Sequence, residues 1–239
     1  MVCALPLSVT LQFFKVHDNR MLNQDYTQQV VLNIDALAWE NSPAKGVTRK
    51  KLERQDAEQG RATSVVRYAP GSEFVTHQHP AGEEIYVLDG VFSDEHGDYP
   101  AGTYLRNPAG TSHAPFSKEG CTLFVKLCYF DPADTTQLAI NTNERPWLPG
   151  VVDGLQVMSL HNFEGEHTAL VRWRANTQFQ PHQHWGGEEI LVLSGEFRDE
   201  HGRYPSLYWL RSPHLSKHCP FVGEQETIIL VKTGHLPVA

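Results

Sequence analysis

Two segments of the chain, 74–90 and 179–195, place two histidines and a glutamate in the pattern His-x-His-x3-Glu. Residues two positions apart on a β-strand project from the same face, so each pair of histidines can point at one spot. The turn that follows lets the glutamate return to that spot from the next strand. Another histidine follows 34 residues after the second one in both copies. The candidate ligands are therefore His77, His79, Glu83 and His113 in the first copy, and His182, His184, Glu188 and His218 in the second.

Three imidazoles and one carboxylate form a suitable ligand set for a divalent transition metal. A single His-x-His pair on a strand is more often a surface or core feature. Here the spacings of two, four and 34 residues are the same in both copies, and histidines that only pack in a core have no reason to keep them. We therefore expect one divalent metal ion in each half of the chain. Zn, Fe(II), Mn and Ni all accept imidazole and carboxylate, so the ligand set leaves the metal open.

The ligand segments belong to an internal repeat at a constant offset of 105 residues, which also relates DEHGDYP (94–100) to DEHGRYP (199–205). Further along, the offset becomes 106, where FVK (124–126) aligns with LVK (230–232). Loops tolerate such changes in length and strands do not. Each half is therefore expected to be one structural unit.

A polar, proline-bearing segment, 131–146, joins the two halves. We expect an N-terminal segment at 1–28, a first domain at 29–137 and a second domain at 138–239. Residues 1–20 lack the positively charged start and the cleavage motif of a secretory signal. They are expected either to precede a natural start at Met21 or to form a strand at the edge of a barrel.

The elements that must position these ligands are short strands. Runs such as TSVVRYA (63–69) and CTLFVKLCYF (121–130) are rich in β-branched and aromatic residues. Gly, Pro, Asn and Asp separate such runs at intervals of about 8–12 residues. No segment shows a convincing helical period of apolar residues. The sequence therefore predicts an all-β protein built from sandwiches or small closed barrels.

The composition excludes some classes of function. The chain has 239 residues and a formal net charge of −8, which argues against a nucleic-acid-binding surface. No apolar run reaches the roughly 18 residues of a membrane-spanning helix, so no membrane partner is expected. Four cysteines occur without a Cys-x-x-Cys pair, which favours free thiols in a reducing cytoplasm.

The first half resembles the two sequence motifs of the cupin superfamily. Its matching residues are His77-x-His79-x3-Glu83-x6-Gly90 and Gly102-x5-Pro108-x-Gly110-x2-His113. The second half departs from the motifs at turns, where Asn176 and Leu215 replace glycines and Ser206 falls near the place of a third. The chain thus resembles a bicupin, which implies two tandem cupin barrels of the RmlC-like, double-stranded β-helix (jelly-roll) class.

The finer resemblance, over roughly residues 35–235, is to cupins of the ChrR type, which bind zinc. It implies zinc in preference to Fe(II), Mn or Ni, and a sensory or regulatory protein related to oxidative-stress transcription control. The helical anti-sigma domain of ChrR is not expected here, because about 30 residues precede the first repeat. The alternative is a metal-dependent (Fe, Zn or Mn) cupin dioxygenase, such as one that acts on a diketone like acetylacetone. Either function has a small molecule or an oxidant as the partner in the barrel, and a homodimer is a further expectation.

Several repeated residues outside the ligand sets are given structural roles. Glu84 and Glu189 are expected to face away from the ligands, in solvent or at a turn. Lys126 and Lys232 are expected to point outward. Arginines at barrel mouths can clamp a carboxylate, but pairing with acidic residues is preferred for Arg67, Arg172, Arg106 and Arg211. Trp185 is expected either to pack in the ordinary way or to line the mouth of the second barrel, and His96 and His201 to occupy exposed hairpin tips.

Overall fold

A computed structural model describes residues 21–56 and 60–238. This part of the chain contains β-strands and two short 3-10 helices, η1 (Ile34–Ala36) and η2 (Thr142–Glu144), and no α-helix. The all-β prediction is therefore confirmed. None of the helices in the described residues is long and apolar enough to cross a membrane. The alternatives considered for residues 1–20 lie outside the described residues.

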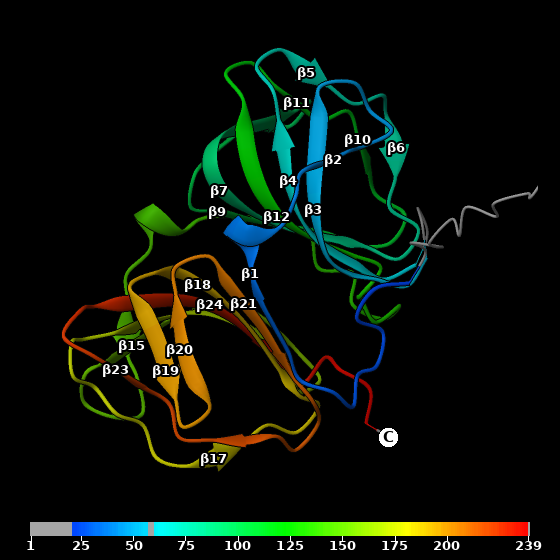
Figure 1. Cartoon of the computed structure of the whole chain (residues 1–239). Helices are drawn as coiled ribbons and strands as arrows, with labels where there is room; N and C mark the ends of the chain where they lie inside the picture. The colour runs from blue at the N-terminus through cyan, green and yellow to red at the C-terminus, as the bar shows by residue number, and fades with distance from the viewer. Residues whose placement is uncertain (1–20, 57–59, 239) are drawn as a thin grey trace, which may run out of the picture.

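Figure 1 shows two β-barrels, one above the other, formed by the two halves of the chain. The large sheet of the first barrel has the order β13 (Leu138–Asn141), β9 (Thr103–Asn107), β7 (Glu83–Asp94), β12 (Cys121–Leu127), β4 (Ala62–Tyr68), β3 (Val47–Arg54) and β2 (Glu40–Asn41). The far half of β7 pairs with β8 (Gly97–Pro100) and β11 (Phe116–Ser117), and β11 pairs with β5 (Ser72–Glu73). A separate pair, β6 (His77–Gln78) and β10 (Ser112–His113), completes the barrel.

The long strand β7 serves both layers of the first barrel because it changes direction near its middle. Its pairing with β12 shifts register between Thr122 and Leu123, and Gly90 follows with φ +73°. A side chain at Gly90 would place its Cβ 2.1 Å from the carbonyl oxygen of Gly120. Only glycine fits this close approach of two backbones, which explains why the repeat keeps a glycine here.

The second barrel repeats the architecture. Its large sheet has the order β1 (Val30–Asn33), β21 (Tyr208–Ser212), β18 (Glu188–Ser194), β24 (Thr227–Thr233), β16 (Glu166–Trp173), β15 (Leu155–Phe163) and β14 (Leu148–Pro149). The opposite layer contains β20 (Gly202–Pro205), β19 (Glu196–Asp199) and β23 (Phe221–Val222). The strands β17 (His182–Gln183) and β22 (Lys217–His218) form the pair that corresponds to β6 and β10.

The two barrels exchange strands. Strand β1, which leads into the first barrel, pairs along its whole length with β21 of the second barrel, as Figure 1 shows. Strand β13, which leads into the second barrel, pairs in the same way with β9 of the first. Each large sheet thus includes one edge strand from the opposite half of the chain. These exchanged strands connect the two domains by backbone hydrogen bonds.

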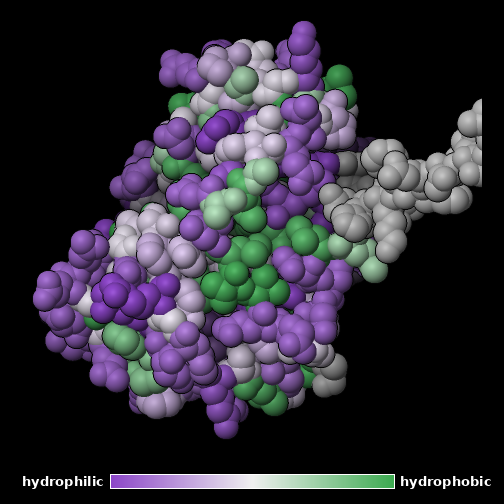
Figure 2. All heavy atoms as spheres, viewed as in Figure 1, coloured by the Kyte–Doolittle hydropathy of each residue, from purple (hydrophilic) through white to green (hydrophobic). Residues whose placement is uncertain are grey.

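The large sheets also pack against each other. Ile85 and Val87 point into the first barrel, whereas Tyr86, between them on β7, belongs to a core shared with the second barrel. That shared core includes Trp209 and Leu230 of the second half. The space-filling view shows hydrophobic residues gathered at the junction of the barrels, around β1, within a mostly hydrophilic face (Figure 2).

The buried face between the sheets corrects two predictions. Glu84 and Glu189 do face away from the ligands, but they are only 4% and 3% exposed and are neither solvated nor at a turn. Lys126 and Lys232 point into the same interface and are 3% and 4% exposed. Residues on the outer face of each large sheet contact the other domain and not water, because the two large sheets pack against each other. Each lysine forms an ion pair with the glutamate of the other domain.

The turns of the second barrel keep their shape without the motif glycines. Asn176 and Leu215 have φ +62° and +59°, and they stand where Gly71 and Gly110 stand in the first barrel. The third position is held by Leu207 at φ +64°, next to Ser206. A left-handed leucine is unusual, and its strain is borne by the surrounding fold.

Candidate metal centres

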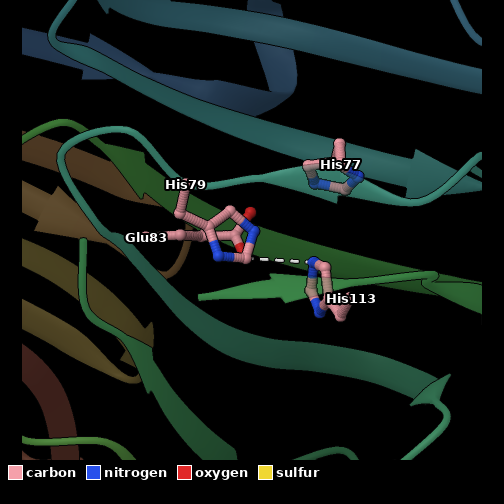
Figure 3. Close-up of side chains that lie close together, drawn as sticks. All are labelled: His77, His79, Glu83 and His113. Carbon is pink, nitrogen blue, oxygen red and sulfur yellow. Dashed lines mark ion pairs between the residues drawn. The ribbon is translucent and has the colours of Figure 1, made fainter. Parts of the chain in front are cut away.

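The candidate ligands of domain 1 converge on one point. His77 on β6 and His113 on β10 are directly opposite each other in the strand pair, and the side chains of His79 and Glu83 approach from the following turn and the start of β7 (Figure 3). Each of the four offers a ligand atom, and these atoms all lie within 4.8 Å of one another. The four residues are thus brought together as predicted, but His79 lies just beyond the two-residue strand β6 and not on the same strand as His77.

Outer partners orient all three imidazoles of domain 1. Contacts to Nδ1 come from the Val75 carbonyl oxygen at 3.2 Å for His77, from Thr111 Oγ1 at 2.9 Å for His79, and from Asp94 Oδ2 at 3.2 Å for His113. An acceptor at Nδ1 holds the proton there and leaves the lone pair of Nε2 directed at the shared point. This tautomer is the one that binds a metal through Nε2.

The inner nitrogen atoms lack hydrogen bonds. The Nε2 atoms of His79 and His113 are buried and have no hydrogen-bond partner, and both lie beside Glu83 Oε2, at 3.3 and 3.4 Å. Burial, together with the neighbouring His113, lowers the pKa of His79 to about 3. Burial also raises the pKa of Glu83 to about 7, against a hydrogen bond from Asn107 that lowers it. Neutral imidazoles and a costly buried carboxylate are what a cation at the shared point would satisfy.

Three of the four candidate ligands of domain 2 converge in the same way, whereas Glu188 lies outside the set of ligand atoms that are all within 4.8 Å of one another. His182, His184 and His218 bring their ring nitrogens within 4.8 Å of one another. The Nε2 atom of His218 lies 3.2 Å from that of His182 and 3.1 Å from that of His184. Glu188 contacts His184 at 3.3 Å and His218 at 3.5 Å. Burial raises the pKa of Glu188 to about 7.

The two sites differ in the imidazole that the third strand supplies. Burial lowers the pKa of His113, although the hydrogen bond to Asp94 opposes this change. In domain 2 burial acts in the same direction on His218, but the carboxylates of Asp199 and Glu188 outweigh it and raise that pKa. The donor sets of both domains nevertheless fit a divalent transition metal. Both centres are candidates for the same kind of ion.

Each set of ligands opens onto a cavity inside its barrel. All four ligands of domain 1 line a cavity of about 760 Å³, and all four of domain 2 line one of about 390 Å³. Both cavities lie on the inner face of the large sheet. The candidate ligands of each domain are therefore accessible from the cavity of that domain.

Two tandem β-barrels, each with three histidines and a glutamate at its inner end, define the class of bicupins. The sequence model of the ChrR cupin-like domain matches the chain twice, at residues 27–131 and 135–237. The chain therefore belongs to the ChrR cupin-like family, and the resemblance found in the sequence is confirmed. Among curated proteins, none matches the sequence significantly.

Solved structures with similar folds are bicupins and related cupin proteins. A proposed dioxygenase from Nostoc punctiforme is 15% identical with a TM-score of 0.74, over 87% of this chain and 82% of that one. The protein YlbA from E. coli is 14% identical with a TM-score of 0.68, over 90% and 94%. A variant of the Bacillus subtilis oxalate decarboxylase OxdC is 15% identical with a TM-score of 0.62, over 87% and 78%. At such identities the similarity shows the fold.

Sequence reasoning missed the groups that support the ligands. Asp94 and Asp199 belong to the DEHG turns, which were interpreted only as hairpin tips, yet Asp94 contacts His113 and Asp199 lies 3.7 Å from His218. The signal was present, since both copies keep the aspartate. His96 and His201 in the same turns are exposed, as predicted.

The other predicted side chains have packing roles. Arg106 pairs with Glu84 and Arg211 with Glu53, so the preferred pairing with acidic residues is confirmed for these two. Arg67 instead stacks on the ring of Trp39, and Arg172 combines a similar stack on Trp147 with a contact to Glu226. Trp185 is 68% exposed and rests against His214, so it is not packed in the core, and it is not among the described residues that line the domain 2 cavity.

Proposed function

We propose that the protein is a divalent-metal-dependent enzyme of the dioxygenase type, which acts on a small molecule in the cavity of domain 1. The proposal depends on one observation, that all four candidate ligands line one cavity of about 760 Å³. Ligand-binding pockets commonly have volumes of about 300–1,000 Å³. A catalytic metal keeps a position open to substrate, whereas a structural zinc site is closed by its protein ligands. The ligand-sized cavity favours the catalytic arrangement.

Each residue around the candidate metal centre of domain 1 would have its own role. The metal, held by the three histidines and Glu83, would supply Lewis acidity to a bound oxygen atom. Thr111 and Asp94 would hold His79 and His113 with Nε2 directed at the ion, through their contacts with the Nδ1 atoms. The apolar part of the cavity wall, which includes Phe74, Leu123 and Val125, would keep bulk water from the reacting atoms.

Oxygen uptake after loading with Fe(II) tests this proposal. The substrates offered are small diketones such as acetylacetone and small carboxylates, and the metal content of protein purified without chelator is measured in parallel. We expect oxygen consumption by the wild-type protein, its loss in His79→Gln and its retention in His184→Gln. Iron-loaded protein that consumes no oxygen with any of these substrates would contradict the proposal.

A second candidate function is a cytoplasmic zinc-binding sensor or regulator, related to the control of transcription in oxidative stress. It is favoured by membership in the ChrR cupin-like family. In this function an oxidant or small ligand enters a barrel and alters the surface that a partner recognises. Purified protein that carries one zinc ion in each domain and shows no turnover would support this candidate over the enzyme.

A further inference from the structure

The cavities of the two domains have different walls, although their candidate ligands are the same. We infer that the cavity of domain 1 binds a small carboxylate with an apolar body, through Arg49 and Ser64, and that the cavity of domain 2 does not. This inference rests on the proposed function, because it names the class of molecule that reaches the same metal centre. Equivalent positions of the two large sheets carry different side chains in the cavity walls.

The strand register identifies the equivalent positions. Arg49 on β3 is paired with Val66 on β4, and in the second barrel Val157 on β15 is paired with Val171 on β16. All four residues line their respective cavities. The repeat therefore places a guanidinium in the wall of domain 1 at the position where domain 2 has an isopropyl group.

A second polar residue distinguishes the wall of domain 1. Ser64 lines the cavity and is 5% exposed, and its buried hydroxyl has no hydrogen-bond partner in the structure. Its equivalent in the second barrel is Ala169, since Ser64 is paired with Lys51 and Ala169 with Ser159 at the matching step of the register. A buried hydroxyl without a partner is costly, and a bound ligand would satisfy it.

The walls of the two cavities differ in the cationic side chains that they carry. Arg49 and Arg54 both line the first cavity. A guanidinium has five N–H donors, so it can hold a carboxylate by a bidentate pair and keep other contacts as well. The described lining of the second cavity includes Glu188 and no lysine or arginine. In the domain 2 cavity an anion would lie near the carboxylate of Glu188, and no lysine or arginine of the described lining would offset the repulsion.

The rest of the first cavity is apolar, which defines the body of the ligand. Phe74, Val66, Leu123 and Val125 form much of its wall. Burial of apolar carbon against these side chains adds to binding in proportion to the area removed from water. A branched or aromatic monocarboxylate therefore fits better than formate or oxalate, which have no apolar body.

Cobalt-loaded, full-length protein tests the inference. The visible spectrum of Co(II) is titrated with isobutyrate and with the neutral isobutyramide. The His184→Gln variant reports domain 1, and the His79→Gln variant reports domain 2. We expect isobutyrate to perturb the spectrum of domain 1 at concentrations at least tenfold lower than it needs in domain 2, and isobutyramide to have no such preference.

Substitutions in the wall assign the effect to its residues. Arg49→Met is expected to weaken isobutyrate binding to domain 1 by at least tenfold and Ser64→Ala by about threefold, while Arg49→Lys retains part of the affinity. Val157→Met is the matched control in domain 2 and should change nothing. Unaltered cobalt stoichiometry shows that each variant has folded.

Equal binding of isobutyrate by the two domains would overturn the inference, as would full affinity in folded Arg49→Met. These measurements report binding and do not depend on catalytic turnover. A lack of oxygen uptake would therefore count against the proposed function while the preference for a carboxylate is judged separately.

Discussion

The ammonium group of Lys232 lies 2.9 Å from Glu84 Oε2, so a lysine of domain 2 neutralises the residue next to the candidate ligand Glu83 of domain 1. The reverse relationship also holds, because Lys126 of domain 1 lies 2.6 Å from Glu189, the neighbour of the ligand glutamate in domain 2. Successive residues of a strand face opposite sides, so one glutamate faces the barrel and the next faces the other domain. Each candidate metal centre is thus one residue away from an ion pair with the opposite barrel.

This crossed arrangement predicts that each lysine supports the metal centre of the other domain. In Lys232→Met, the carboxylate of Glu84 loses a buried partner, and the start of β7 that also carries Glu83 is less firmly held. We expect the metal affinity of domain 1 to fall by about tenfold and that of domain 2 to change little. Lys126→Met should show the opposite pattern. The affinities are measured by competition with a chromophoric zinc chelator, in variants that keep only one metal centre.

The control for the lysine variants is Lys118→Met, at an exposed position of domain 1, which should leave both affinities unchanged. An equal loss at both centres in Lys232→Met would point to a general loosening of the interface. That outcome would refute the crossed arrangement.

Arg106 is the centre of a buried charge network between the domains, and its removal should cost much stability. It is fully buried, donates a hydrogen bond of 3.0 Å to Glu84 and pairs with Asp134, which also contacts His161 of domain 2. Arg106→Met leaves two buried carboxylates with reduced compensation, so we expect the free energy of unfolding to fall by about 3–5 kcal/mol. Urea unfolding measures this change. Arg174→Met, at an exposed position, should alter stability by less than about 0.5 kcal/mol.

The sequence was sufficient to predict the fold and the convergence of the ligands because both depend on local, repeated patterns. Short runs of β-branched and aromatic residues, separated by turn residues, identify strands, and the spacing of His77, His79 and Glu83 is set within one short segment of the chain. His113 was placed correctly because the hairpin-like segment before it repeats before His218.

The sequence did not show what covers the outer face of each large sheet. Whether Glu84 and Lys126 meet water or protein depends on how the two large sheets pack, and no local pattern encodes this packing. A lysine and a glutamate in apolar strands, each repeated in both halves, are compatible with an exposed sheet or with a buried pair. The sequence also did not predict that β1 and β13 pair with the opposite barrel. A strand that pairs with the other barrel has the same composition as one that pairs within its own.

The aspartates behind the third histidine of each site should have unequal effects on metal binding. Asp94 Oδ2 lies 3.2 Å from Nδ1 of His113, whereas Asp199 Oδ2 lies 3.7 Å from Nδ1 of His218. We expect Asp94→Asn to lower the metal affinity of domain 1 by about 10–100-fold, because the imidazole loses the partner that fixes its tautomer. Asp199→Asn should lower the affinity of domain 2 by a smaller factor. Isothermal titration with zinc measures both effects, and equal losses would show that the closer contact has no special role.

The ion pairs between the domains should make stability fall in acid through Glu84. Burial alone would raise the pKa of this carboxyl, but Lys232 and Arg106 outweigh burial and lower the pKa to about 2 from an ordinary value of 4.5. The unfolded chain therefore takes up a proton at a higher pH than the folded one. The stabilisation is fully present above pH 4.5 and is lost as the pH falls toward 2. In urea unfolding of metal-free protein, the stability advantage of the wild type over Glu84→Gln should shrink between pH 5 and pH 3. An advantage that stays constant over this range would show that Glu84 is not held ionised by the lysine and arginine beside it.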